Sequence, residues 1–275
     1  MERVAAVVVD YHAGEALGAC VDSLRENGVS EVVVVENGAT GTAQAALAGR
    51  GARLVEPGVN LGYGRGANRG AAEAPPSRYL LISNPDLVVH PGAVAALCGH
   101  LDDHPDVGVA GPRIERPDGS TYPSHRVFPN VWLAGAHALL GSWWPGNPAT
   151  VAYRSARPDG GVDWVSGAFM LFRREAFDAV GGFDERYFMF AEEMAICWAL
   201  GRAGWRVAAV EGAVVTHVEG LSREREPRRM LVAHHASALR FEWQTASGAR
   251  RLLFPLAALV VGVRLVASLV VGRWA

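Results

Sequence analysis

The chain has 275 residues, enough to bury a sizeable core, and we expect one α/β domain with an appendage in preference to a single larger domain. The formal net charge is -2 and no run of like charges marks a tail, which argues against a nucleic acid partner. The cysteines Cys20, Cys98 and Cys197 are far apart and form no CxxC pair, which excludes the usual zinc and dithiol motifs and favours a reducing cytosol.

The first half of the chain alternates short β-branched runs with stretches that have apolar residues at helical spacing. The expected strands are residues 4–9, 31–35, 52–55, 79–82 and 107–110, and the expected helices are residues 14–27, 42–49, 66–74 and 92–104. The first strand begins almost at the N-terminus without the features of a signal peptide, so none is expected. This alternation predicts βα units and a mostly parallel sheet, whose ligands bind at the C-terminal ends of the strands.

The second half is less regular. Pro, Gly and Trp are frequent between residues 112 and 163, which we interpret as an excursion over the acceptor side. Order returns at residues 164–172. The elements expected after them are a helix start at 174–180, a helix at 192–203, a strand at 206–210, a strand-like segment at 212–216 and a helix at 228–243. The last of these helices could join the C-terminal tail in a homodimer interface.

Residues 252–271 are apolar apart from Pro255 and Arg264, and the segment is close to the length that spans a bilayer. Because Arg264 lies near its middle, a helix on the membrane surface is favoured over a span. A helix packed on the domain or on a partner subunit is an alternative of nearly equal weight.

Two segments are candidates for binding phosphate. Asn84-Pro-Asp86 presents a carboxylate after a buried strand, and a hard cation that bridges two phosphates needs only one or two such ligands. An Asx turn is the alternative interpretation. Residues 60–70 are Gly-rich and lead into a helix, so backbone amides and Arg65 could face a diphosphate. A dinucleotide fingerprint would follow the first strand instead of the third, which disfavours a dehydrogenase and leaves a plain Gly-rich turn as the alternative.

Polar residues also follow the first two strands, at the edge where a base and ribose would lie. Tyr11 could stack on the base, and Glu36, followed by Asn37, could accept a hydrogen bond from a pyrimidine N3–H. Each residue alone suits an ordinary loop, and their joint placement favours a nucleotide site.

Glu192 and Glu193 open a helix after the aromatic run at residues 187–190. Burial beside aromatic rings raises a carboxyl pKa and the helix N-terminus lowers it, so a base that titrates near neutrality is attainable. Simple capping of the helix explains the same residues, and without other information it is the preferred reading. His217 could be a metal or phosphate ligand, although a lone histidine is more often structural.

Taken in order, these segments resemble family 2 glycosyltransferases of the GT-A fold, from about residue 4 to residue 222. The motifs are Asp10-Tyr11, Glu36-Asn37, Asn60-Leu-Gly-Tyr-Gly64, Asn84-Pro-Asp86, Trp164-Val-Ser-Gly167, residues 181–189, Glu192-Glu193, Ala203-Gly-Trp205 and His217. The middle section is similar to bacterial rhamnosyltransferases that add L-rhamnose to GlcNAc-diphosphoryl-polyprenol, on the segments Pro117-Asp-Gly-Ser-Thr-Tyr-Pro-Ser124, Trp144-Pro-Gly-Asn-Pro148 and Ala152-Tyr-Arg154.

The resemblance implies an inverting, metal-dependent transfer from dTDP-rhamnose to a GlcNAc-diphosphoryl-polyprenol or a related cell-wall glycan, at the inner face of the cytoplasmic membrane. It implies Glu193, with Glu192, as catalytic carboxylates, and Asp86 with His217 as ligands of Mg²⁺ or Mn²⁺. The implied donor-nucleotide residues are Tyr11, Glu36, Asn37, Asn60, Gly62, Arg65, Asn68 and Asn84, and the implied acceptor residues are Trp164, Ser166 and Gly167.

The resemblance also divides the chain. Residues 1–222 form the GT-A domain, with a nucleotide-sugar half at 1–111 and an acceptor and catalytic half at 112–222, and residues 223–275 form a helical extension that is apolar from 252. Relatives commonly read Glu-Asp-x-Asp where this chain reads Glu192-Glu193-Met194-Ala195, so the base is longer and a second acidic group is missing.

Three rivals remain open from the sequence. One is the same fold with a UDP-hexose or UDP-galactofuranose donor, and another is a catalytically silent protein that binds a nucleotide-sugar or a polyprenyl phosphate. The weakest is a sugar nucleotidyltransferase, since residues 11–14 lack the positive charge that its first loop needs.

Overall fold

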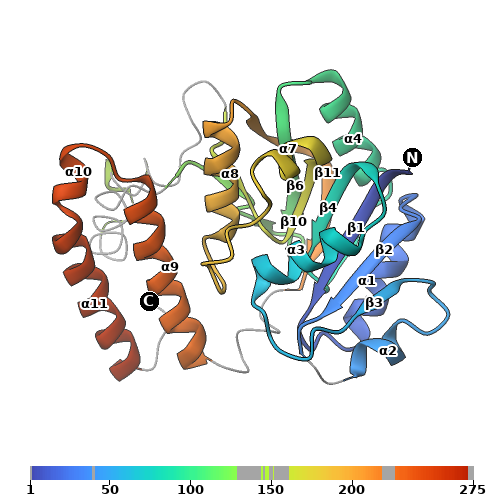
Figure 1. Cartoon of the computed structure of the whole chain (residues 1–275), viewed down its shortest axis with the longest axis horizontal. Coiled ribbons are helices and arrows are strands. Elements are labelled where there is room, and N and C mark those ends of the chain that lie inside the picture. Colours follow the sequence, from blue (N-terminus) through green and yellow to red (C-terminus); the bar gives the residue numbers. More distant parts are fainter. Residues whose placement is uncertain are drawn as a thin grey trace.

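The computed structural model describes residues 2–38, 41–128, 144, 146–148, 151, 161–218 and 227–271. Within these residues, nine strands form one sheet with helices on both faces (Figure 1). The strand order is β3 (Arg53–Val55), β2 (Glu31–Glu36), β1 (Glu2–Asp10), β4 (Ser77–Ser83), β10 (Phe169–Arg173), β6 (Val107–Glu115), β11 (Arg206–His217) and β5 (Leu87–Val89), with β7 (Thr121–Tyr122) paired to β6.

The N-terminal half of the sheet is parallel, as expected, because β1 pairs in parallel with β2 and β4 and β2 with β3. β10 runs antiparallel between β4 and β6. Its first residue, Phe169, lies opposite Ser83, the last residue of β4. The turn that precedes β10 therefore reaches the C-terminal edge of the parallel strands. A second, two-stranded sheet pairs β8 (His125–Arg126) with β9 (Trp164–Val165).

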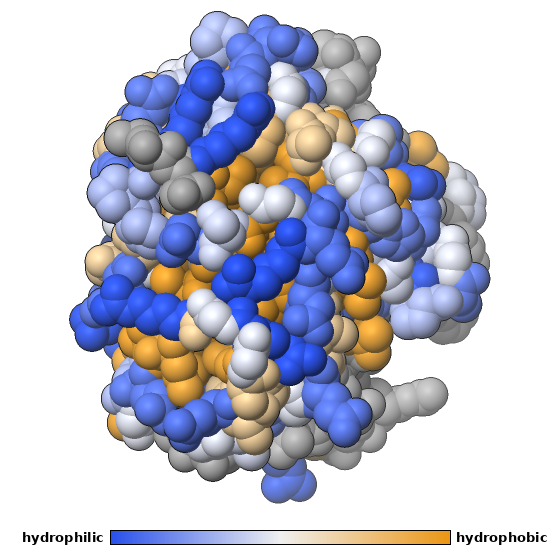
Figure 2. Space-filling model, turned by 90° about the vertical axis from the view of Figure 1, so that its right-hand side faces the viewer, coloured by the Kyte–Doolittle hydropathy of each residue, from blue (hydrophilic) through white to orange (hydrophobic). Residues whose placement is uncertain are grey.

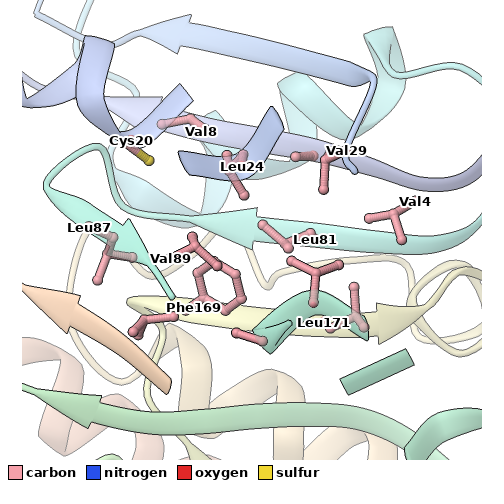
Figure 3. Close-up of a cluster of buried hydrophobic side chains, with 14 of the residues drawn as sticks. Val4, Val8, Cys20, Leu24, Val29, Leu81, Leu87, Val89, Phe169 and Leu171 are labelled. Atoms are coloured by element: carbon pink, nitrogen blue, oxygen red, sulfur yellow. The ribbon is translucent and has the colours of Figure 1, made fainter. Parts of the chain in front are cut away.

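Helices cover both faces because β1 is apolar on both sides, which is typical of a central parallel strand. Val4, Ala6 and Val8 belong to one buried cluster and Val7 and Val9 to another. Figure 3 shows the first cluster between the sheet and its neighbouring helices. The first cluster includes residues of α1 (Glu15–Glu26) and α4 (Ala93–Asp103), and the second includes residues of α3 (Tyr63–Glu73), α7 (Arg174–Ala179) and α8 (Glu192–Arg202).

Several expected boundaries were wrong. β11 joins the strand expected at 206–210 and the strand-like residues 212–216 into one strand that ends at His217, with a register shift between Val210 and Val214 in its pairing with β6. α3 begins at Tyr63 instead of residue 66, and α2 (Thr42–Ala46) is shorter than expected. The ordered segment expected at 164–172 contains two strands, β9 and β10, and β5 was not expected. The longer β11 matters most, since it carries His217 to the edge of the sheet.

The C-terminal helices stand beside the sheet. α9 (Pro227–Thr245) lies between α8 and α11 (Phe254–Val271), and α10 (Ala249–Leu252) joins the pair (Figure 1). The Trp243 and Phe254 rings meet edge to face at 4.9 Å between centroids. In the part of the chain that the structure describes, no helix combines the length and hydropathy needed to cross a membrane. The expected domain boundary at residues 222–223 falls outside the described residues, as do Ala152, Tyr153 and Arg154 of the middle section.

The molecular surface differs between the two ends of the molecule. On the side that carries α1, α2 and β3, hydrophilic residues are spread over the surface with apolar ones visible between them (Figure 2). On α11, in contrast, large apolar side chains are exposed at helical spacing: Leu256, Leu259, Val263 and Val266.

Candidate active site

Three buried carboxyl groups gather at one edge of the sheet. Asp10 and Glu36 are paired residues at the ends of β1 and β2, and Asp86 follows β4. Asp10 and Glu36 are each 1% exposed and Asp86 is 8% exposed. Backbone N–H groups of Ala13 and Thr42 donate to Asp10 Oδ1 and Glu36 Oε1, each at 3.1 Å. Burial raises the pKa of Asp10, and the charges of Glu36 and Asp86 raise it further.

Asn37 and Asn60 shape the Gly-rich turn before α3. The Asn37 amide donates to the Gly62 carbonyl at 2.8 Å and accepts from the Leu61 N–H at 3.2 Å. The Asn60 side chain accepts from the Gly62 N–H at 2.9 Å. The two expected donor-binding side chains thus hold the turn in place, at the edge where Glu36 lies.

Arg65 and Asn68 face a different segment. Arg65 Nε donates to the Glu185 carbonyl at 2.8 Å, and Asn68 exchanges two hydrogen bonds with the backbone of Phe183, both at 2.9 Å. These contacts join α3 to the turn that leads toward α8. The donor-binding role expected for Arg65 and Asn68 stays a prediction, and their structural role is to brace this turn.

β11 brings His217 to Asp86. His217 Nε2 lies 3.1 Å from Asp86 Oδ1 and 3.4 Å from the Asn84 amide nitrogen, and both ring and carboxyl are 8% exposed. His217 Nδ1 is buried without a partner. Among the described residues, no group of three or more His, Cys, Asp or Glu side chains could hold a metal ion. An oxygen and a nitrogen ligand nevertheless fit a cation whose remaining ligands are phosphate oxygens and water.

Glu192 and Glu193 form the first turn of α8. Glu192 is buried, 5% exposed, and its Oε2 has no partner, whereas Glu193 is half-buried. Burial raises the pKa of Glu192 well above its ordinary value, and the Glu193 charge adds to the effect. Burial also raises the pKa of Glu193 to about 7, against the lowering effects of a backbone hydrogen bond and of Arg126. Capping alone would lower both values, so these positions suit a general base.

The turn at residues 166–168 connects the two groups of carboxylates. The Asn84 N–H donates to the Ala168 carbonyl at 2.8 Å, and the Tyr63 hydroxyl donates to the Gly167 carbonyl at 2.5 Å. A Cβ on Gly167 would lie 3.2 Å from Glu193 Cβ, so this turn also touches the base candidate. The turn therefore links the Asp86 loop to α8 over a short distance.

The expected acceptor residues surround the same turn. The Ser166 N–H donates to the Ser124 carbonyl at 2.7 Å, and its hydroxyl accepts from the Ala168 N–H at 3.3 Å. Trp164 Nε1 donates to the Val127 carbonyl at 3.1 Å, and the Arg126 guanidinium lies 5.9 Å from the Trp164 ring centroid. These residues thus form the wall beside Glu193.

Three residues of the site were not assigned a role from the sequence. Asp10, and not Tyr11, is the buried member of its pair, Tyr63 lies beneath the 166–168 turn, and Arg126 acts on the Glu193 charge. Asp10 could have been found, since it ends an apolar strand. Arg126 could not, because it belongs to an irregular segment with no periodic signal.

Sequence comparison gives a close match. The sequence profile of the family described as glycosyltransferase like family 2 matches residues 2–234. The N-acetylglucosaminyl-diphospho-decaprenol L-rhamnosyltransferase of Mycobacterium tuberculosis is 41% identical over 260 residues, which cover 88% of this chain and 84% of that protein. Rhamnosyltransferase WbbL of Escherichia coli strain K12 is 38% identical over 71 residues, 26% of this chain and 27% of its own length.

Solved structures share the fold at low identity. GalNAc-T7 with UDP, GalNAc and Mn²⁺ superposes with a TM-score of 0.60 at 15% identity, over 80% of this chain and 43% of that chain, so the match spans less than half of it. Mannosyltransferase PcManGT from Pyrobaculum calidifontis, in complex with GDP-Man and Mn²⁺, superposes with a TM-score of 0.58 at 17% identity, over 99% of this chain and 76% of that one. These matches confirm a GT-A-like fold.

Proposed function

Since the chain belongs to glycosyltransferase like family 2, we propose that this glycosyltransferase moves L-rhamnose from dTDP-L-rhamnose to a GlcNAc-diphosphoryl-polyprenol or a related cell-wall glycan acceptor. The sugar and acceptor are those that the name of the mycobacterial relative gives. The observation that carries the chemistry is the position of Glu193, a half-buried carboxyl with a pKa of about 7. It lies beside the 166–168 turn, which adjoins the Asp86 loop.

In the proposed reaction Glu193 acts as the general base. It takes the proton from the acceptor hydroxyl as that oxygen attacks the anomeric carbon, and the bond to the nucleotide diphosphate breaks on the opposite face. A base that titrates near neutrality is suited to this transfer, because it is ionised at working pH and still holds a proton well. Burial and the Glu193 charge raise the pKa of Glu192 well above its ordinary value, which disfavours a second negative charge at this helix end.

Asp86 and His217 would hold Mg²⁺ or Mn²⁺ in this proposal. The metal would supply positive charge to the leaving diphosphate. The chain contributes the carboxylate, the ring nitrogen and the N-terminus of α3, whose first turn lies beside the Asn37-braced loop. Asn84 fixes the ring by its contact with His217 Nε2.

The base and ribose would lie against the ends of β1 and β2. Glu36 would accept from a pyrimidine N3–H and Tyr11 would stack on the ring. The Tyr11 and His12 rings already meet edge to face, 4.4 Å between centroids, at this edge. dTDP and UDP share the N3–H group, so this contact supports a pyrimidine nucleotide but does not distinguish between donors that carry different sugars.

The proposed acceptor explains the surface of α11. Its exposed apolar side chains, with Arg250 and Arg251 at the preceding turn, suit a helix that lies on a bilayer. A polyprenol-linked acceptor resides in that bilayer, so we propose that the enzyme works at the inner face of the cell membrane.

The silent-protein alternative rests on Ala195 and on the longer side chain of Glu193 at the base position, and the position of Ala195 weakens the first of these grounds. Ala195 is 2% exposed and packs with Tyr187 and Phe241 in an apolar cluster against α9. An acidic side chain at position 195 would be buried in this cluster and would face away from the 166–168 turn. The missing carboxylate is therefore a feature of the α8–α9 packing, and Glu193 keeps its place beside the turn.

A transfer assay tests the proposal. dTDP-L-rhamnose, UDP-galactofuranose and UDP-GlcNAc are offered with a short-chain GlcNAc-diphosphoryl-lipid and Mg²⁺ or Mn²⁺, to the wild type, Glu193→Gln and Asp86→Ala. Rhamnose transfer that both substitutions abolish is the expected result. Transfer from a UDP-sugar alone would replace the donor, and tight donor binding without transfer would favour a silent binding protein.

A further inference from the structure

The segment at residues 187–191 directly precedes the helix that carries the candidate base, and two of its residues have an uncommon backbone conformation. Phe190 and Ala191 both have positive φ, 68° and 63°, directly before α8. Apart from these two, His12 is the one non-glycine residue with positive φ in the described ranges. Such a conformation costs free energy in a residue with a side chain and persists only where the surroundings fix it. The contacts that fix this segment therefore set the position of Glu193.

One side of the segment contacts the Gly-rich turn before α3, at Gly62 and Tyr63, which we call the donor loop. The Phe188 carbonyl accepts from the Tyr63 N–H at 3.0 Å, at the start of α3. Gly62 packs so closely that a Cβ there would come within 2.1 Å of the same carbonyl oxygen. The segment thus cannot move toward the donor side.

The other side is held by α9. The Tyr187 hydroxyl donates to Gln244 Oε1 at 2.7 Å, and the Ser237 hydroxyl donates to the Met189 carbonyl at 2.8 Å. Tyr187 is fully buried and Ser237 is 6% exposed, so water does not readily replace either bond. The Phe190 ring also meets the His234 ring at 5.3 Å between centroids.

We propose that α9 is part of the catalytic unit, with Ser237 and Gln244 as positioning residues that fix the 187–191 segment and so place Glu193 against the 166–168 turn. The inference rests on the proposed function. It extends that function beyond the family match, which ends at residue 234, before both residues. The C-terminal helical pair then sets the geometry of the base in addition to presenting α11 to its surroundings.

The test uses the full chain and compares variants that each lose one hydrogen bond. Ser237→Ala and Gln244→Leu remove bonds to the 187–191 segment. Thr245→Ala is the matched control, because the Thr245 hydroxyl donates to the Phe241 carbonyl at 2.9 Å within α9 itself. Ser237→Thr and Gln244→Glu keep a donor and an acceptor, respectively, and serve as rescues. The readouts are kcat, donor KM, donor Kd, the pH profile of kcat and Tm.

We expect Ser237→Ala and Gln244→Leu each to lower kcat about 10- to 100-fold, because small displacements of a reacting group have effects of that size. Donor Kd should stay within about twofold, the acid limb of the pH profile should shift, and both rescues should restore kcat. Thr245→Ala should keep the wild-type kcat and pH profile.

Two results would overturn the inference. One is a wild-type kcat in both loss variants, and the other is an equal loss in Thr245→Ala, which would mean a general effect on stability. Glu193→Gln in the same assay separates this inference from the proposed function. If Glu193→Gln is fully active, the base assignment fails. If Glu193→Gln is inactive and both Ser237→Ala and Gln244→Leu have the wild-type kcat, only the role of α9 fails.

Discussion

At the scale of single residues, two adjacent glutamates at one helix end have different environments. Glu192 points into the interior, next to Gly64 of α3, and burial raises its pKa well above the ordinary value. Glu193 is half-buried, and burial raises its pKa to about 7. The helix N-terminus favours a charged carboxylate, so the rise means that desolvation outweighs it. This difference in burial is why we propose Glu193, and not Glu192, as the base.

The pH dependence of kcat follows from this pKa. The base must be ionised, so we expect kcat at saturating donor to rise about tenfold per pH unit below about pH 7 and to level off above it. The measurement is initial rate between about pH 5.5 and 8.5. A profile that is flat across this range, with chemistry rate-limiting, would contradict the assignment of Glu193.

Whereas kcat should rise with pH, the contribution of Glu193 to the stability of the folded state should fall as the pH rises. The folded state keeps a proton on Glu193 up to about pH 7, whereas the unfolded chain loses it near the ordinary value of 4.5. The favourable contribution of protonated Glu193 to the free energy of unfolding is complete below pH 4.5 and is lost as the pH rises to about 7. We therefore expect Glu193→Gln to raise Tm by several degrees at pH 8 and to have little effect at pH 4.5, as measured by thermal unfolding. Equal Tm values at pH 8 would show that the ionised group is well solvated.

Metal binding can be tested at Asp86 and His217 without turnover. We expect Asp86→Ala and His217→Ala to weaken Mn²⁺-dependent binding of the donor nucleotide at least about tenfold, since each removes one of two protein ligands. The measurement is calorimetric titration with and without Mn²⁺. His90→Gln is the control, because the His90 ring forms a hydrogen bond of 2.8 Å with the hydroxyl of Thr216, the neighbour of His217 on β11. An equal loss in all three variants would indicate damage to β11 instead.

At the scale of elements, the close approach of the donor loop to the 187–191 segment determines where α3 begins and how the segment before α8 is held. α3 starts at Tyr63 because Gly62 adopts φ 83° and leaves room for the Phe188 carbonyl. The same contact fixes one side of the segment that precedes α8. The element proposed to bind the donor and the element proposed to carry the base are thereby in contact through a single glycine.

Gly62→Ala should separate these two elements. A Cβ at position 62 would lie 2.1 Å from the Phe188 oxygen, so we expect a loss of at least about 2 kcal/mol in the free energy of unfolding and a much lower kcat. Gly92→Ala has a matched φ of 82° and nothing within 4 Å, so it should cost only about 1 kcal/mol. Urea unfolding of both variants makes the comparison, and equal losses would mean that φ alone matters.

At the scale of the whole molecule, the C-terminal helices connect the catalytic site to an apolar surface. α9 contacts the 187–191 segment, α11 packs on α9, and Leu259, Val263 and Val266 are each about 60% exposed. Because a row of exposed apolar side chains is typical of an interaction site, we propose that α11 carries a binding surface.

Vesicle binding tests the proposed membrane contact. We expect Leu259→Glu with Val263→Glu to reduce binding to vesicles that contain anionic lipid at least about tenfold, because each change removes buried apolar area and adds repulsion. Turnover of a short-chain acceptor in solution should not change. Val59→Glu is the control, since Val59 is 59% exposed on a loop far along the chain. Unchanged vesicle binding, with a changed sedimentation profile, would instead favour a homodimer through α11.

The order of the chemistry-bearing motifs was readable from the sequence, and so was the fold class. Apolar runs of strand length end at Asp10, Glu36 and Asn84, and parallel strands bring such ends to one edge. The identity of the helix that carries Glu192 and Glu193 was also predictable, because its apolar periodicity is local. These features depend on short-range patterns, which sequence alone determines.

Only the tertiary structure decided the pairing of elements that are distant along the chain. β10 runs antiparallel beside β4, which puts Gly167 against Glu193, and a register shift lets β11 carry His217 to Asp86. Arg65 and Asn68 brace a turn more than one hundred residues away. Burial, and with it the pKa of Glu193, results from this packing, because desolvation depends on every neighbour in space and not on neighbours in sequence.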